Sequence, residues 1–323
     1  MDDASLALVS PKALRAAASP RLQKIEVVVN PLAGHAGPGA AAEAEAIISE
    51  FGFRPRVRVL GPKQLRLELR NVVASGPDLL IVLAGDGTAR SAANLCGAHG
   101  PLLAPLAGGT MNMLPHALYG PQDWKSALRQ TLTEGVVRPV SGGEVDGHRF
   151  HVAAVLGPPA LWAEAREAAR VGALALAWRK ASAAWRRTFN HNLRFALDGH
   201  APGKAEALAL VCPLVSRVMG AHELALEAAA LHPRGAAEAM RLGLHALLRD
   251  VIGDWRNDPA VEMTRCRTGI AWANRGHVHA ILDGEPIRLR RRVEFRFVPM
   301  AFRALVPPRP DPAPEAASAI TAG

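Results

Sequence analysis

The first half of the chain alternates short apolar runs with longer stretches that have the length and composition of helices. Continuous apolar or β-branched runs that end at a turn signal are typical of strands buried on both faces of a sheet. Strands are predicted at Ile25–Val29, Arg56–Leu60, Asp78–Leu83 and Leu102–Leu106, and helices at Gly39–Glu50 and Gln64–Ala74. Because the two kinds of segment alternate, we predict an α/β domain with a parallel sheet.

After Val136–Val140 the pattern changes to short apolar runs separated by turn signals. Three Asp-Gly pairs punctuate these runs, at Asp146-Gly147, Asp198-Gly199 and Asp283-Gly284, and such pairs favour tight hairpin turns. A second domain that is mainly antiparallel, a β-sandwich, is therefore expected. Its strands are predicted at Gly143–Val145, Phe150–Leu156, Leu193–Leu197, Glu206–Val211, Leu224–Ala228, Val261–Cys266, Gly269–Ala273, Val278–Leu282 and Val293–Val298.

A length of 323 residues suits two domains that each bury a core. We predict that the α/β domain spans residues 24–139 and the β-rich domain residues 140–299. Residues 1–23 are predicted to form a flexible arm, and residues 307–323, rich in Pro and Ala, a disordered tail. A helical stretch with tryptophans and interleaved basic residues, Pro159–Asn190, is expected either to lie at a membrane interface or to pack on the sandwich.

Three glycine-rich loops follow predicted strands of the parallel sheet. They are Asn30–Gly37, Gly85-Asp86-Gly87-Thr88 and Gly108-Gly109-Thr110-Met111-Asn112. Glycine allows close approach to a ligand, and the next helix offers free N–H groups to an anion. Either of the last two loops alone is a simple turn signal, but the pair in tandem, at the strand ends where such sheets bind ligands, predicts phosphate binding. Neither a GxxxxGK[ST] nor a GxGxxG motif is present.

The overall charge narrows the choice of partner. The formal net charge is +9, so an anionic partner is expected: nucleic acid, an anionic membrane surface or a phosphorylated substrate. No aromatic-plus-basic signature of RNA binding occurs, which argues against nucleic acid. The three cysteines, Cys96, Cys212 and Cys266, lie far apart and form no CxxC pair, so we expect a reducing, cytoplasmic setting.

Four motifs in one order carry a resemblance to a known family. They are Val29-Asn30-Pro31 with Gly34, Ala84-Gly85-Asp86-Gly87-Thr88, Pro105-Leu106 followed by Gly109-Thr110-Met111-Asn112, and Asp283-Gly284-Glu285. The set resembles the diacylglycerol-kinase-type lipid kinases, whose nucleotide domain is similar to that of NAD kinases. The Asp-Gly-Glu motif argues against NAD kinase itself. The resemblance also implies that residues 300–306 return to the first domain.

The resemblance implies an ATP-dependent lipid kinase that needs Mg²⁺. The acceptor would be the hydroxyl of diacylglycerol, of a ceramide or sphingoid base, or of a similar lipid. Glu285 is expected to accept the proton of that hydroxyl, with Asp283 as its partner or the alternative base; Asp86 is a third candidate base and faces the metal through ATP. ATP is expected on Asn30, Pro31, Gly34, Gly85, Asp86, Gly87, Thr88, Gly109, Thr110 and Asn112.

The same resemblance places the enzyme in the cytoplasm, peripheral to the inner face of an anionic membrane. Among the positions that depart from the family pattern, Ala84 replaces a glycine, and Arg90 and Ser91 stand where Asn and Glu often follow. These departures motivate the alternative of a catalytically weak regulatory relative that binds nucleotide or lipid. The further hypothesis of a nucleic-acid-binding protein rests on the net charge alone. The sequence does not indicate an oligomeric state.

Overall fold

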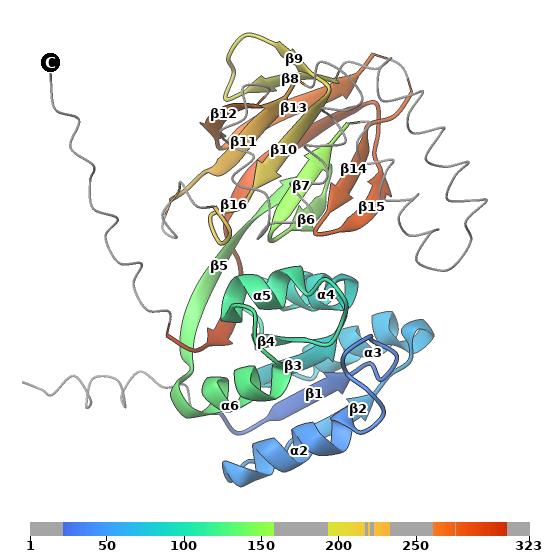
Figure 1. Cartoon of the computed structure of the whole chain (residues 1–323), viewed down its shortest axis with the longest axis vertical. Coiled ribbons are helices and arrows are strands. Elements are labelled where there is room, and N and C mark those ends of the chain that lie inside the picture. The colour runs from blue at the N-terminus through green and yellow to red at the C-terminus, as the bar shows by residue number, and fades with distance from the viewer. Residues whose placement is uncertain are drawn as a thin grey trace, which may run out of the picture.

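The computed structural model describes residues 22–157, 193–216, 219, 223–232, 261–274 and 276–308. The predicted helical stretch Pro159–Asn190 lies outside the described residues, as do residues 1–21 of the predicted arm and residues 309–323 of the predicted tail. Two sheets organise the described part of the chain, and the larger one runs through both domains. Figure 1 shows a β-rich part above a part in which helices cover the remaining strands.

The α/β domain follows from its apolar runs. Its strands are β1 (Ile25–Val29), β2 (Arg56–Val59), β3 (Leu79–Ala84) and β4 (Leu102–Ala107), paired in parallel in the order β2-β1-β3-β4. Every residue of β1, β3 and β4 is buried, as expected for strands covered on both faces. The helices are α2 (Ala40–Glu50), α3 (Pro62–Ala74), α4 (Asp86–Cys96), α5 (Met113–Tyr119) and α6 (Trp124–Glu134).

The helices divide between the two faces of this sheet. Buried side chains of α3, α4 and α5 pack in one core cluster, and those of α2 and α6 pack in another on the opposite face. Because β1, β3 and β4 are parallel, the three glycine-rich loops that follow them all leave the same edge of the sheet, at the carboxyl ends of these strands. This confirms the predicted α/β domain with a parallel sheet.

The β-rich domain is built from short strands and from parts of two long ones, β5 and β16. They are β5 (Val136–Val145), β6 (His148–Phe150), β7 (Ala153–Leu156), β8 (Leu193–Leu197), β9 (Gly203–Ala205), β10 (Ala207–Val211), β11 (Leu226–Leu231), β12 (Val261–Cys266), β13 (Thr268–Ala273), β14 (His279–Leu282), β15 (Glu285–Arg288) and β16 (Arg292–Val306). One sheet, β12-β11-β10-β7-β14-β15, is entirely antiparallel. A core of residues from both sheets lies between them, which confirms the predicted antiparallel sandwich-like domain.

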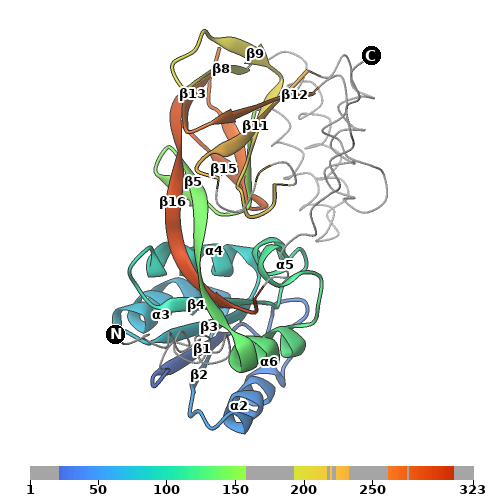
Figure 2. The same ribbon diagram turned by 90° about the vertical axis from the view of Figure 1, so that its left-hand side faces the viewer.

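Two long strands join the domains. β5 and β16 pair antiparallel along most of their length, and the far end of β16 lies parallel to β4, with Ala304 opposite Leu103. Figures 1 and 2 both show this ribbon running from the sandwich down into the helical layer. The predicted boundaries at residues 139/140 and 299/300 thus fall inside β5 and β16. The pairing register of the ribbon shifts between Val298 and Phe302.

All three Asp-Gly pairs form turns with positive φ at both residues. Asp146, Asp198 and Asp283 have φ between 47° and 50°, a region that asparagine and aspartate tolerate better than most residues. Strands β8 and β12 coincide with their predicted limits. The prediction missed β9 and β15 and cut β16 short at Val298.

Candidate active site

The first and third glycine-rich loops are tied together at the edge of the sheet. The N–H of His35 donates to the carbonyl of Gly108 at 2.9 Å, and the ring of His35 contacts the carbonyl of Gly109. A Cβ added at Gly34 would come 3.1 Å from Thr110 Cγ2, so the two loops touch. In the first loop Asn30 uses its side-chain oxygen to accept the N–H of Leu32 at 3.1 Å.

The second loop and the start of α4 present both an anion-binding end and a carboxylate. Gly85 has an extended conformation and precedes α4, so the first N–H groups of the helix have no helical partner. Asp86 and Thr88 were predicted to lie in a loop before the helix, but α4 begins at Asp86 and both residues lie in its first turn. Asp86 Oδ1 accepts the N–H of Met113, at the start of α5, at 2.6 Å. Burial raises the pKa of Asp86, against the backbone N–H groups of residues 112–114, and the nearby charge of Glu285 raises it further.

The third loop is closed by Asn112. This residue has φ of 50° and ψ of 41°, the left-handed region, and its side chain is buried. Asn112 Oδ1 accepts the N–H of Gly109 at 2.7 Å, and its Nδ2 donates to the Gly109 carbonyl at 2.9 Å. A Cβ at Gly109 would lie 2.7 Å from Gly85 Cα, so glycine is needed where the second and third loops meet. Asn112 therefore shapes the loop, and its side-chain groups are already occupied.

The Asp-Gly-Glu turn of the second domain reaches this edge. Asp283 and Gly284 form the two-residue turn between β14 and β15, with φ of 48° and 86°. A Cβ at Gly284 would lie 3.3 Å from Met113 Sδ, so the turn packs against the third loop and α5. The turn thus contacts the α/β domain directly.

Asp283 is a buried structural carboxylate. Its two oxygens accept the N–H groups of His151 at 2.8 Å, Val152 at 2.8 Å and Ala153 at 3.1 Å. Burial raises the pKa of Asp283 to about 6, because it outweighs the lowering effect of these N–H groups and of the Arg90 charge. With both oxygens engaged, this side chain is poorly placed to take a proton from a substrate.

Glu285 lies beside the glycine-rich loops of the α/β domain. Its side chain is exposed, and it makes no hydrogen bond or ion pair to another described residue. A Cβ added at Gly87 would lie 3.1 Å from Glu285 Oε1, so the carboxylate rests against the first turn of α4. Two carboxylates, Asp86 and Glu285, are thereby brought together from different domains beside a helix N-terminus.

The donor set fits a divalent cation that is shared with a phosphate ligand. Among the described residues no group of three or more His, Cys, Asp or Glu side chains could hold a metal by itself. In kinases Mg²⁺ takes one or two carboxylates and completes its shell with phosphate oxygens and water. Asp86 and Glu285 are oxygen donors of that kind, and the predicted role of Asp86 toward the metal stays a prediction.

Sequence reasoning missed three residues at the domain interface. Arg90 Nη1 donates to the carbonyl of Leu282 at 2.8 Å, and Asn94 Oδ1 lies 3.0 Å from Nε2 of His151. Burial, with the nearby charges of Arg149 and Arg90, lowers the pKa of His151 to about 3, so its ring is neutral. A departure from the family pattern at Arg90 was the single sequence signal, and it pointed to altered function instead of an interdomain contact.

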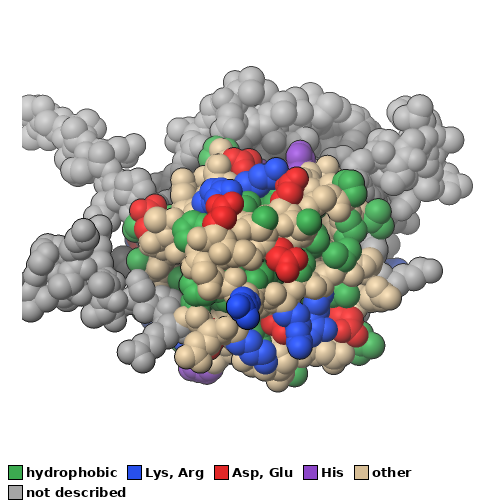
Figure 3. Space-filling model, turned by 90° about the horizontal axis from the view of Figure 1, so that it is seen from below, with side chains coloured by type: hydrophobic (Ala, Val, Ile, Leu, Met, Phe, Trp, Pro, Cys, Tyr) green, Lys and Arg blue, Asp and Glu red, His purple; other side chains and the backbone are tan. Residues whose placement is uncertain are grey.

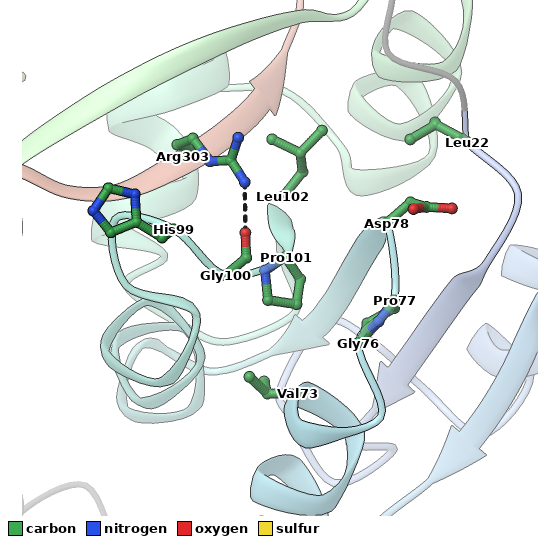
Figure 4. Close-up of a pocket in the computed structure, with 10 residues that line it drawn as sticks. All are labelled: Leu22, Val73, Gly76, Pro77, Asp78, His99, Gly100, Pro101, Leu102 and Arg303. Atoms are coloured by element: carbon green, nitrogen blue, oxygen red, sulfur yellow. Dashed lines mark hydrogen bonds between the residues drawn. The ribbon is translucent and has the colours of Figure 1, made fainter.

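A pocket of about 530 Å³ lies at the opposite edge of the parallel sheet, where β3 and β4 begin (Figure 4). Its lining includes Asp78, Pro101, His99 and Arg303, whose Nη2 donates to the Gly100 carbonyl at 2.7 Å. The three glycine-rich loops leave the other edge of the sheet. The pocket is therefore separate from the site formed by those loops.

Comparison with known proteins agrees with the geometry. Residues 24–145 match the model of the diacylglycerol kinase catalytic domain. A crystal structure of a diacylglycerol kinase from Bacillus anthracis str. Sterne is similar, with a TM-score of 0.64 and 15% identity over 90% of this chain and 99% of that one. A second structure from the same organism, of a candidate diacylglycerol kinase, has a TM-score of 0.66 and 17% identity over 90% and 99%. No curated protein matches this chain.

Proposed function

We propose that this chain transfers the γ-phosphate of ATP to a lipid hydroxyl, because residues 24–145 match the diacylglycerol kinase catalytic domain and the fold is similar to that of a diacylglycerol kinase. The observation that carries the proposal is the meeting of Asp86 and Glu285 beside the N-terminus of α4. The acceptor would be diacylglycerol, a ceramide or sphingoid base, or a similar hydroxylated lipid.

The triphosphate would lie along the three glycine-rich loops. The first turn of α4 offers N–H groups and the positive end of a helix dipole, which favour a phosphate. In the proposal Thr88 and Thr110 donate their hydroxyls to phosphate oxygens. Mg²⁺, when bound, would neutralise charge on the phosphates. Most of the rate enhancement in such transfers comes from positioning and charge stabilisation.

Glu285 is the proposed proton acceptor. The lipid oxygen would form a bond to the γ-phosphorus while the bond to the β–γ bridging oxygen breaks and ADP leaves. The hydroxyl proton would pass to the Glu285 carboxylate. The exposure of Glu285 supports this role, as do the three N–H groups that occupy Asp283 and the Met113 N–H that Asp86 accepts. Asp86 is the alternative base.

The departures from the family pattern do not favour a catalytically weak relative. Ala84 is the last residue of β3 and is buried in the sheet, so its methyl group replaces no phosphate-facing atom. Ser91 donates its hydroxyl to the carbonyl of Gly87 within α4 at 2.8 Å. Arg90 makes an interdomain hydrogen bond. Each of these side chains has a structural partner or place that leaves the proposed chemistry intact.

We further propose that the enzyme meets its lipid at an anionic membrane surface, on the strength of the net charge of +9. No helix in the described ranges is long and apolar enough to cross a bilayer. The underside of the α/β domain carries basic and acidic side chains interspersed (Figure 3). The ion pairs Arg129–Glu50 and Lys125–Glu43 join α6 to α2. That mixed face is a poor candidate for the membrane contact.

The test is a phosphorylation assay with labelled ATP, Mg²⁺ and a total bacterial lipid extract, followed by separation of the lipids. A new labelled lipid that is lost in Asp86→Ala and Glu285→Gln, and kept in the control Arg129→Ala, supports the proposal. Unchanged turnover in Glu285→Gln would refute its role as base. No product with intact ATP binding in a thermal-shift measurement favours the regulatory relative, and no product without ATP binding refutes the proposed role of the loops.

A further inference from the structure

Helix α4 contacts the second domain along one face, at positions three and four residues apart. Gly87 lies against the Glu285 carboxylate, Arg90 Nη1 donates to the Leu282 carbonyl, and Asn94 Oδ1 pairs with Nε2 of His151. Residues with this spacing fall on the same side of a helix over successive turns. One stripe of α4 therefore carries these contacts to the Asp-Gly-Glu turn and to the start of β7.

The groups that this stripe contacts are themselves joined into one unit. Leu282 immediately precedes Asp283, whose carboxylate accepts the N–H groups of His151 and the two residues after it. The N–H of Asp283 donates in return to the Ala153 carbonyl at 2.9 Å. The two-residue turn leads directly into Glu285. A contact that holds this turn in place therefore also fixes the position of the Glu285 backbone, from which the side chain extends.

The positive charge of Arg90 also acts on the buried carboxylate of the turn. Its guanidinium lies near the buried Asp283 carboxylate and lowers the pKa of that group, against the larger effect of burial. His151 is neutral, so its Nε2 can donate to the Asn94 oxygen without adding a second positive charge. Arg90 is thus the cation among these contacts, and it both donates to Leu282 and compensates a buried anion.

We propose that Arg90, assisted by Asn94, is an interdomain positioning residue: it holds the Asp283 turn against α4 and so places Glu285 beside Gly87 and Asp86. This inference rests on the proposed kinase function for its catalytic consequence, but the clasp itself is a structural arrangement. Because Arg90 acts through Glu285 and its side chain donates to Leu282 of the second domain, its loss should reduce turnover and leave ATP binding intact.

The kinetic test uses Arg90→Met, which keeps the apolar stem, and Arg90→Lys, which keeps the charge. We expect kcat to fall by about 10- to 100-fold in Arg90→Met, the effect of misplacing a reacting group by a fraction of an ångström to an ångström. Arg90→Lys should recover part of that loss, and the ATP-induced thermal shift should match wild type. In a Glu285→Gln background Arg90→Met should cost nothing more.

The control is Arg129→Ala, which removes an exposed guanidinium from α6 in the same domain. Wild-type kcat in Arg90→Met, or a full further loss in the Glu285→Gln background, would overturn the positioning role.

A second measurement separates the clasp from the kinase activity. Hydrogen exchange of peptides that cover residues 151–153 and 282–285 should speed up in Arg90→Met and stay at the wild-type rate in Arg129→Ala. If the wild type phosphorylates no lipid but this exchange difference is seen, the proposed function fails and the clasp stands. Unchanged exchange in Arg90→Met refutes the clasp, whatever the activity.

Discussion

The buried carboxylate of Asp283 makes a specific prediction for stability as a function of pH. Its pKa in the folded protein is about 6, raised by burial from an ordinary value of 3.8. Between these two values the folded protein holds a proton that the unfolded chain has lost. The contribution of this group to stability is therefore complete below about pH 3.8 and is lost as the pH rises through about 6.

The magnitude follows from the separation of the two pKa values. A difference of about two pH units corresponds to about 3 kcal/mol in the free energy of unfolding. Asp283→Asn cannot titrate, so it removes this pH dependence and provides the reference. We expect wild type to gain about 3 kcal/mol relative to Asp283→Asn between about pH 7 and about pH 3, measured by urea unfolding of both proteins.

The opposite slope would refute this reasoning. If wild type instead gains stability over Asp283→Asn as the pH rises, the N–H groups of His151, Val152 and Ala153 dominate over burial, and the carboxylate has a lowered pKa. A flat difference would show that the two effects cancel. Other carboxylates titrate in both proteins, so their contributions are removed when the two curves are subtracted.

Substitutions at three further positions test the site. Gly87→Ala should leave the free energy of unfolding unchanged or raise it by up to about 1 kcal/mol in urea unfolding, because alanine favours a helix. It should nevertheless reduce phosphoryl transfer in the lipid assay, because the added methyl group crowds Glu285. Wild-type activity in this variant would contradict the prediction. Gly109→Ala should destabilise by about 1–3 kcal/mol through its clash with the Gly85 backbone and weaken the ATP-induced thermal shift. Asn112→Ala should lower the free energy of unfolding by about 1–3 kcal/mol, measured by urea unfolding, because the Asn112 hydrogen bonds are lost. Asn112→Gly should lower it by less, since glycine accepts the left-handed conformation at this position. Equal losses in the two variants would show that backbone strain plays no part.

The sequence was informative where a local pattern has one physical solution. The apolar run of β3 predicts a strand buried on both faces. The Gly-Asp-Gly sequence that follows predicts a tight turn into the next helix, which is α4. The Asp283-Gly284 pair likewise predicts a two-residue hairpin, which the structure contains. These features depend on neighbouring residues and on backbone conformation, both of which a single sequence displays.

What the sequence could not supply were contacts between distant segments. Arg90 and Leu282 are 192 residues apart, and no local rule connects them. Asp283 was a candidate base because a carboxylate beside glycine is chemically suitable, but its oxygens are taken by N–H groups from residues 151–153. The predicted strand Val293–Val298 was too short, because the observed strand contains Pro299 and continues past a shift in register that no local pattern indicates.

The far end of β16 has a consequence for how this protein can be made and divided. Phe302, Ala304 and Val306 belong to the core beneath α3 and α4, and Leu305 to the core on the other face of the sheet. A ribosome must therefore synthesise the chain as far as β16 before the first domain can close its edge at β4. A fragment of residues 24–145, the part matched by the family model, would expose that edge and both cores. The α/β domain is consequently completed by a strand that is distant from it in sequence, and a fragment designed to fold this domain should reach Val306.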